Sequence, residues 1–220
     1  LGTKDNTFEV PYELSYPNYE DIRGLSEVFS DAIAFHNAVF NLSADNQPER
    51  AWAEFVTGNY FSMLGVEPAV GRTFTAEESR VPGADAVVVL SFAYWQKRFG
   101  GQESAIGRTV KLNGIPFTII GVAPETFKGT ESVLALDLFV PLGIKERFYP
   151  KAAGQFARRG DTNLHVLARL KPGISLDQAR ASVEVLARQL EQKHPDTNKA
   201  TSFAMELETH SRPVISIAQY

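Results

Sequence analysis

The chain has 220 residues with a formal net charge of −4 at pH 7, and 44% of its residues are hydrophobic while 22% are charged. That balance is ordinary for a globular protein with its own core, and it argues against a nucleic-acid surface, which needs clustered Lys and Arg. There are no cysteines, which excludes disulfides, thiol catalysis and zinc–thiolate sites, and no run approaches the roughly 18 apolar residues that a membrane helix needs.

The N-terminal part predicts a strand followed by a short helix. Residues 8–14 alternate between apolar and polar side chains, with an interruption at Pro11. Ser15 is placed to begin a helix, with Pro17 near the first helical position and Gly24 at the end. Acidic residues in this stretch suit the positive end of the helix dipole.

A long strand and its partner are expected next. Residues 28–42 form the first strand, 45–48 a turn, and 51–56 the returning strand. The large apolar residues of the first strand fall largely on one parity: Phe29, Ile33, Phe35 and Val39. The first unit is therefore strand, helix and hairpin.

Residues 57–78 are interpreted as the hinge between two subdomains. Within them, 59–64 carry apolar residues at helical spacing, and Gly65 is placed to end a single helical turn. Thr75 and Glu78 repeat the spacing of a helix capping box.

Most of the elements predicted in the middle region, residues 65–158, are β-strands. The apolar run 86–90 is typical of a strand covered on both faces, and Ser91 caps a predicted short helix over 92–99. A hairpin is predicted from 109 to 122, because Asn113-Gly114 supplies the positive φ angles of a two-residue turn. Residues 138–142 form a last short strand, and 143–160 read as a loop with some helical content.

After Asp161 the sequence again predicts strands and a helix, as it does in the N-terminal part. Residues 164–170 alternate as a strand, and Ser175 with Gln178 forms a capping box for an amphipathic helix over 175–193. Residues 202–207 read as a closing strand. The apolar face of the helix is formed by Leu176, Ala179, Val183, Leu186 and Leu190. Strand–helix–strand units at both ends fit an α+β fold with a ferredoxin-like split sheet.

No residue is predicted to be catalytic, to bind a cofactor or to ligate a metal. The four histidines share no spacing suited to a metal: His36, His165, His194 and His210. A GxSxG nucleophile elbow is absent. The acidic pairs Glu20-Asp21 and Glu77-Glu78 stand at predicted helix starts, where compensation of the dipole explains them.

Three short motifs invite a functional reading that the residues do not support. Residues 101–109 resemble a phosphate loop, but the glycines are six apart where five is required, and Arg108 replaces the lysine. Residues 159–161 spell Arg-Gly-Asp, and a glycine-centred turn explains them better than adhesion. Asn41 begins a glycosylation sequon only if the source is eukaryotic.

Two apolar features have a packing explanation. The aromatic pair Tyr94-Trp95 is expected in the core of the middle region rather than on a ligand platform. The apolar stripe of the helix 175–193 is fully used by packing against one sheet, so a core-facing role is favoured over a partner surface.

Several motifs in a fixed order resemble the MacB-like periplasmic core domain, the extracytoplasmic domain of MacB/FtsX-type ABC transporter permeases. The resemblance covers roughly residues 15–207. The amino-acid sequence of residues 95–101 is most similar to acidobacterial-type orphan permeases of that group. The motifs are GNYFSMLGVEPAVGRTFTAEE (58–78), VVVLSFAYWQKRFGG (87–101), IGRTVKLNGIPFTIIGVAPETFKG (106–129), LFVPL (138–142) and LARLKPGISLDQARA (167–181).

The resemblance implies a porter-like α+β subdomain, residues 1–64 with 160–220, and an inserted β-rich subdomain, residues 65–159. It implies a periplasmic domain between two membrane helices of a permease that relays ATP-driven change to export outside the membrane, without catalysis. The implied partners are its own transmembrane helices, a second copy or pseudo-copy, a cytoplasmic ATPase and a periplasmic adaptor; no cofactor is implied.

Two alternatives stay open on the residues alone. One is a stand-alone periplasmic module that binds a peptide or lipoprotein, although the sequence names no apolar groove for it. The other is a hydrolase with a dispersed active site. The sequence does not identify a transported substrate.

Overall fold

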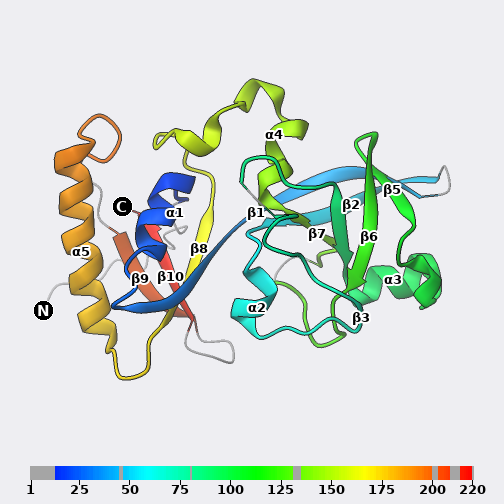
Figure 1. The fold of residues 1–220 in the computed structure, drawn as a ribbon, viewed down its shortest axis with the longest axis horizontal. Helices are drawn as coiled ribbons and strands as arrows, with labels where there is room; N and C mark the ends of the chain where they lie inside the picture. The colour runs from blue at the N-terminus through cyan, green and yellow to red at the C-terminus, as the bar shows by residue number, and fades with distance from the viewer. Residues whose placement is uncertain are drawn as a thin grey trace, which may run out of the picture.

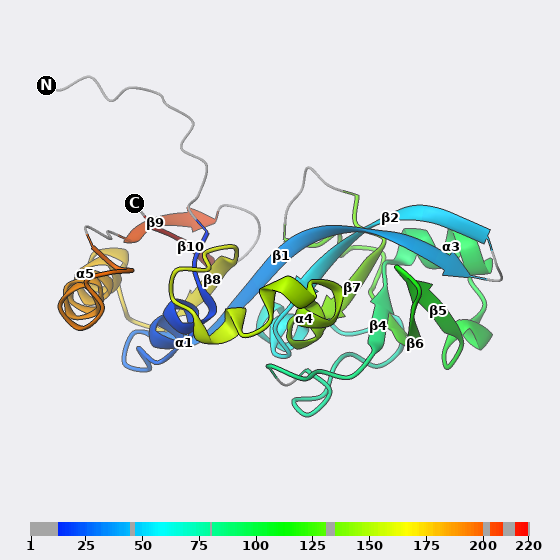
Figure 2. The same ribbon diagram turned by 90° about the horizontal axis from the view of Figure 1, so that it is seen from above.

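The computed structural model has two lobes that lie side by side along its longest axis (Figures 1 and 2). It describes residues 13–44, 47–79, 81–130, 135–199, 203–208 and 214–219; side chains from 203 onwards are not described. Strand β1 runs from one lobe into the other, so that a single ten-stranded sheet includes both.

The first lobe, here called the barrel, is built from six strands. They follow the order β1-β2-β7-β4-β6-β5 and return to β1, because β1 pairs with both β2 and β5. The β2–β7 and β4–β6 pairs are parallel and the others antiparallel, so the barrel is mixed. The strands are β1 (Phe29–Ala44), β2 (Gln47–Val56), β4 (Val87–Leu90), β5 (Thr109–Leu112), β6 (Ile115–Val122) and β7 (Leu138–Pro141).

The second lobe, here called the helical lobe, extends the sheet in the order β1-β8-β10-β9 through antiparallel pairs. Helix α1 packs on β1, and α5 packs on β9 and touches α1. Figure 2 shows both helices below β9 and β10. The elements are α1 (Tyr16–Arg23), β8 (His165–Leu170), α5 (Leu176–Lys193), β9 (Phe203–Glu208) and β10 (Val214–Gln219).

Short elements connect the strands of the barrel and lead back to the helical lobe. The segment between β7 and β8, residues 142–164, crosses between the lobes as a chain of short helices and is here called the crossing segment (Figure 1). These elements are α2 (Tyr60–Leu64), β3 (Val70–Gly71), α3 (Phe92–Phe99), η1 (Glu103–Ala105), η2 (Leu142–Ile144), α4 (Lys145–Phe148), η3 (Pro150–Ala152) and η4 (Gln155–Ala157).

The helix caps and the two-residue turn predicted from the sequence are present in the structure. Ser15, Ser91 and Ser175 each accept a hydrogen bond from the third backbone amide of the helix that follows, and the Ser175 capping box is complete. Gly65 ends α2 in the left-handed conformation. Asn113 and Gly114 have φ angles of 47° and 85°, as the predicted two-residue turn requires.

Burial along β1 differs from the prediction. The expected parity holds at Phe29, Ile33 and Phe35, but Val39 is only half-buried while Ala38 and Phe40 are buried. The cause is burial on both faces from Ala32 to Phe35, where Ile33 and Phe35 join one hydrophobic cluster and the even-numbered residues join the other. Beyond Phe35 only the even-numbered face, with Ala38 and Phe40, stays buried. A strand covered on both faces cannot be read by period two alone.

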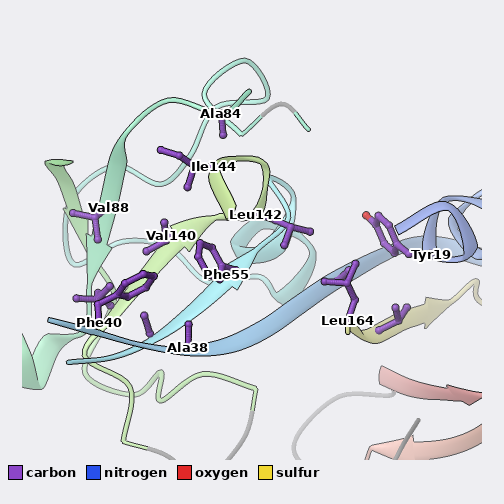
Figure 3. Close-up of a cluster of buried hydrophobic side chains, with 14 of the residues drawn as sticks. Tyr19, Ala38, Phe40, Phe55, Ala84, Val88, Val140, Leu142, Ile144 and Leu164 are labelled. Carbon is purple, nitrogen blue, oxygen red and sulfur yellow. The ribbon is translucent and has the colours of Figure 1, made fainter. Parts of the chain in front are cut away.

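The larger cluster fills the interior of the barrel. Phe40, Phe55, Val88 and Val140 converge there from different strands, and Tyr19 lies with Leu164 farther along β1 (Figure 3). Each of these six side chains is at most 1% exposed. Together they belong to one apolar core that continues from the barrel into the helical lobe.

The predicted capping box at Thr75 forms without a helix, and three other parts of the chain differ from the prediction or lie partly outside the described residues. Thr75 and Glu78 exchange the two capping-box hydrogen bonds, at 3.2 and 3.0 Å, but only turns follow them, so no helix begins there. Strand β10 was not predicted. Of the expected strand 8–14 and turn 45–48, residues 8–12 and 45–46 lie outside the described residues.

The mixed α+β class is confirmed. The barrel uses β2 and half of β1, which precede the predicted subdomain boundary between residues 64 and 65, so the exact division stays a prediction. Within the described part of the chain, no helix combines the length and apolar character needed to cross a bilayer.

Candidate functional site

The point where β1 passes between the lobes is the candidate functional site. At Phe35 the strand pairs with His165 of β8 on one side and with Val56 of β2 on the other. Just before it, Ala34 exchanges hydrogen bonds with Thr57: its amide donates to Thr57 Oγ1 at 3.2 Å, and its carbonyl accepts from the Thr57 amide at 3.0 Å. Backbone pairing therefore continues without interruption through the junction.

A buried lysine lies where the crossing segment passes β1. Lys145, on α4, is 4% exposed, and its Nζ donates to Asn163 Oδ1 at 2.8 Å. Burial lowers the pKa of Lys145 to about 8. Burial, followed by the charge of Lys145, lowers the pKa of His36 to about 4, so its imidazole is neutral at pH 7.

An ion pair ties the crossing segment to the helical lobe. The Arg159 guanidinium donates to Asp21 Oδ2 at 2.5 Å and to Asn18 Oδ1 at 2.7 Å, both on α1. The amide of Asn198, beyond the end of α5, donates to the same Asn18 oxygen at 3.3 Å. Segments far apart in sequence thus meet at one buried asparagine side chain.

A second polar cluster holds the tip of the β1–β2 hairpin against α3. Tyr94 Oη donates to Glu49 Oε1 at 2.8 Å, and Lys97 Nζ lies 3.0 Å from Glu49 Oε2. Arg98 donates to Gln47 Oε1 at 2.8 Å and to the carbonyl of Ala44. The hairpin is therefore fixed to the barrel at its tip.

A buried carboxylate joins β2 to α2. Glu54 is fully buried and accepts hydrogen bonds from Tyr60 Oη and, at 3.0 Å, from Thr130 Oγ1. Burial and the neighbouring Glu54 raise the pKa of Tyr60 well above its ordinary value, so the phenol stays protonated and donates.

The structure brings two of the four histidines together. His36 and His165 are neighbours across β1 and β8, and the His165 ring stacks on Phe35 with centroids 5.3 Å apart. His194 caps the end of α5, and His210 lies outside the described residues. Among the residues described, no group of three His, Asp or Glu side chains could hold a metal.

One member of each acidic pair, Asp21 or Glu78, forms an ion pair, and neither pair stands in the first turn of a helix. Asp21 binds Arg159, whereas Glu20 is exposed in the second turn of α1. Glu78 lies in a turn rather than at a helix start, and its bonds to Arg72, at 2.6 Å, lower its pKa to about 2.

The phosphate-loop resemblance does not lead to an α-helix. Residues 101–109 form a turn and the single-turn η1, and then enter β5. A phosphate loop opens an α-helix whose N-terminus faces the phosphates, so this geometry does not provide one.

The adhesion-like tripeptide and the sequon belong to the fold. Arg159 is tied to α1, and Asp161 pairs with Arg158 at 2.5 Å, so the tripeptide is not presented as a free loop. Asn41 lies within β1, where its backbone amide donates a hydrogen bond to Asn113 Oδ1 at 2.8 Å.

Both aromatic residues of the pair Tyr94-Trp95 are buried, and Trp95 Nε1 donates to the carbonyl of Gln102 at 3.0 Å. On α5 the buried residues are Ala179, Val183, Ala187 and Leu190. The sequence prediction included Leu186, which is partly buried, and missed Ala187.

Sequence reasoning did not find the polar residues of the junction. Lys145, Asn163 and Asn18 carry no spacing signal, because their partners lie up to 180 positions away in the chain. The only local hint is a charged residue directly after the apolar run 138–144.

The sequence matches the family described as MacB-like periplasmic core domain over residues 2–186. The macrolide export ATP-binding/permease protein MacB of Chlorobium phaeobacteroides is 30% identical over 121 residues, which are 53% of this chain and 18% of that protein. The MacB protein of Escherichia coli strain K12 is 28% identical over 153 residues, which are 70% of this chain and 22% of that protein. The chain thus spans about a fifth of the length of these relatives.

Solved structures share the fold. The periplasmic region of MacB from Actinobacillus actinomycetemcomitans superposes with a TM-score of 0.61 at 18% identity, covering 90% of this chain and 83% of that one. The extracellular domain of the noncanonical ABC-type transporter YknZ from Gram-positive bacteria gives 0.60 at 18% identity, covering 83% and 85%. A domain of a permease protein from Porphyromonas gingivalis gives 0.61 at 15% identity, covering 94% and 79%.

Proposed function

The chain belongs to the family of MacB-like periplasmic core domains, and from that premise we propose that it relays ATP-driven movement of a permease to the export of a substrate outside the membrane. As a periplasmic domain homologous to MacB-type permeases, it would act as one rigid lever without catalysis of its own.

The observation that carries this proposal is the continuity of β1 through both lobes. Its backbone pairs with β8 from Phe29 to Phe35 and with β2 from Phe35 to Ala44, so no unpaired linker separates the lobes. The crossing segment adds a second connection, since Arg159 binds α1 while Lys145 binds Asn163. Two parallel connections resist bending better than one, as transmission of force requires.

The finer architecture is part of the proposal. Residues 1–64 with 160–220 would form a porter-like, ferredoxin-like subdomain, and 65–159 an inserted β-rich subdomain into which the β1–β2 hairpin extends. In support, Leu14 bridges to Leu164 and β10 pairs with β8, so the first and last described segments lie beside the same strand. That placement suits a domain held at both ends by membrane helices.

The partners follow from the same premise. The relatives are named ATP-binding/permease proteins, which supports a cytoplasmic ATPase and membrane helices as the partners of this domain. A second copy of the domain is proposed beside them. A periplasmic adaptor is a further proposed partner. The permease role is better supported than a stand-alone peptide- or lipoprotein-binding module, because the relatives carry this domain within a permease.

Spin labels in the intact permease test the rigid lever. The chain has no cysteines, so Ser104→Cys in the barrel and Glu184→Cys on α5 give specific sites, and both residues are exposed. We expect the 104–184 distance within one chain to stay constant between the nucleotide-free and ATP-trapped states, while the distance between the two copies of residue 184 changes. A 104–184 distance that changes on ATP binding would contradict the lever, as would a constant distance between copies.

A further inference from the structure

A cavity of about 810 Å³ lies between β1 and the crossing segment, at the junction of the lobes. Its walls include His36 of β1, Lys145 and Phe148 of α4, and Gln155 of η4. A volume of this order is typical of small-molecule sites, which combine apolar walls with a few placed polar groups.

The cavity contains a buried positive charge. Lys145 is 4% exposed, and its described hydrogen bond goes to a neutral amide oxygen, that of Asn163. No described carboxylate forms an ion pair with Lys145; Glu13 and Asp161 act on it only through space. A buried ammonium is costly unless an anion accompanies it, so the site favours an anionic ligand.

A second donor is present in the same wall. Gln155 is 6% exposed, and its Nε2 is buried without a hydrogen-bond partner among the described residues. The terminal amide carries two N–H donors. Buried donors are normally paired in native proteins, so an unpaired donor on a residue that lines the cavity favours a small rotation of the amide toward an acceptor on a bound ligand.

The remaining charges do not cancel this preference. Arg158 and Asp161 both line the cavity but form an ion pair with each other, at 2.5 Å. Lys151 adds a further positive charge to the rim. The wall near Lys145 therefore carries net positive charge.

The rest of the wall is apolar. Phe148, Tyr149 and Pro150 line the cavity, and Tyr149 is 42% exposed, which is unusual for a large aromatic side chain in this protein. An aromatic wall beside a buried ammonium matches a ligand with an apolar body and an acidic end.

We propose that this cavity binds a small organic carboxylate, whose carboxylate accepts hydrogen bonds from Lys145 and Gln155 and whose apolar body packs on Phe148 and Tyr149. Because the walls come from β1 and from the crossing segment, the bound molecule bridges two connections between the lobes. The proposal does not depend on the permease role.

The test uses three probes of equal chain length with different charge: hexanoate, hexanol and hexylamine. Each is titrated into the 220-residue chain and followed by the backbone amide NMR signals of His36, Gln155 and Asn163. We expect hexanoate to give saturable shifts at these amides and to raise Tm, while hexanol and hexylamine bind at least tenfold more weakly.

Two variants locate the charge. Lys145→Met should weaken hexanoate binding at least tenfold, whereas Lys97→Met, at an exposed lysine on α3, should leave it unchanged. If Lys145→Met does not fold, Gln155→Glu decides instead: it should weaken hexanoate and strengthen hexylamine. Equal binding of hexanoate and hexanol, shifts spread over the surface without saturation, or no effect of either cavity variant would overturn the proposal.

Discussion

The barrel and the helical lobe share β1 but complete their sheets differently. In the barrel, β1 pairs with β2 on one side and β5 on the other, so the sheet closes on itself. In the helical lobe the sheet continues as β8, β10 and β9 and stays open, and α1 and α5 cover it. A closed sheet leaves no strand edge, whereas an open one depends on the elements packed against it.

The two lobes also differ in what holds their parts together. The barrel is held mainly by strand pairing and by a continuous apolar core. The crossing segment is held to the helical lobe by polar contacts, among them Arg159 with Asn18 and Asp21. The comparison teaches that loss of the Arg159 contacts should loosen α1 while the strands of the barrel stay paired.

The largest effect is expected from opening the barrel core. Phe55 is fully buried, with ring centroids 5.5 Å from Phe40 and 5.9 Å from Phe148. Phe55→Ala leaves a cavity and should lower the free energy of unfolding by about 3–5 kcal/mol, measured by urea denaturation. Val185→Ala on the exposed face of α5 is the control, with a change within about 0.5 kcal/mol. A loss below about 1 kcal/mol for Phe55→Ala would show that the barrel core is not the main source of stability.

The junction should respond to pH through His36. The folded-state pKa of about 4 lies below the ordinary 6.5, so between these values the unfolded chain binds a proton that the folded chain does not. The contribution of His36 to the free energy of unfolding is fully present above pH 6.5. It falls by roughly 3 kcal/mol as the pH is lowered toward 4. Denaturation of the wild type and His36→Gln across this range isolates the effect, because other groups cancel in the difference. Parallel pH curves for the two proteins would contradict it.

The contact between β2 and α2 should be sensitive to a single hydroxyl. Tyr60→Phe removes one donor to the buried Glu54, and the cost of an incompletely satisfied buried carboxylate should be about 2 kcal/mol. The matched control is Tyr149→Phe, since Tyr149 is 42% exposed, and it should change the free energy of unfolding by less than about 0.5 kcal/mol. Equal values for both variants would mean that Glu54 is satisfied without Tyr60.

The smallest effect on the free energy of unfolding is expected from Arg159→Gln, which should affect the helical lobe and leave the barrel unchanged. Arg159→Gln removes the ion pair with Asp21, whose side chains are 17% and 32% exposed, and should cost about 1 kcal/mol after screening. Amide hydrogen exchange should become faster in α1 and stay unchanged in the barrel strands. Arg188→Gln on exposed α5 is the control. Faster exchange throughout the barrel would show that the lobes do not open separately.

The elements of both lobes could be predicted from sequence because their signals are local. A serine at a cap position, a glycine after a helix and the pair Asn113-Gly114 act within a few residues of the chain, and α1, α3, α5 and the β5–β6 hairpin formed where predicted. The family was also recognised from sequence, because several motifs stand in a fixed order, and the match over residues 2–186 confirms it.

Closure of the barrel, the faces of β1 and the polar junction were decided only by tertiary structure. Leu42 pairs with Leu112, 70 positions away, and Arg159 contacts Asn18, 141 positions away. The loss of burial on one face of β1 after Phe35 depends on two different layers of neighbours. Local periodicity contains no information about such partners, because the free energy that selects them comes from burial and hydrogen bonds made only when the distant segments meet.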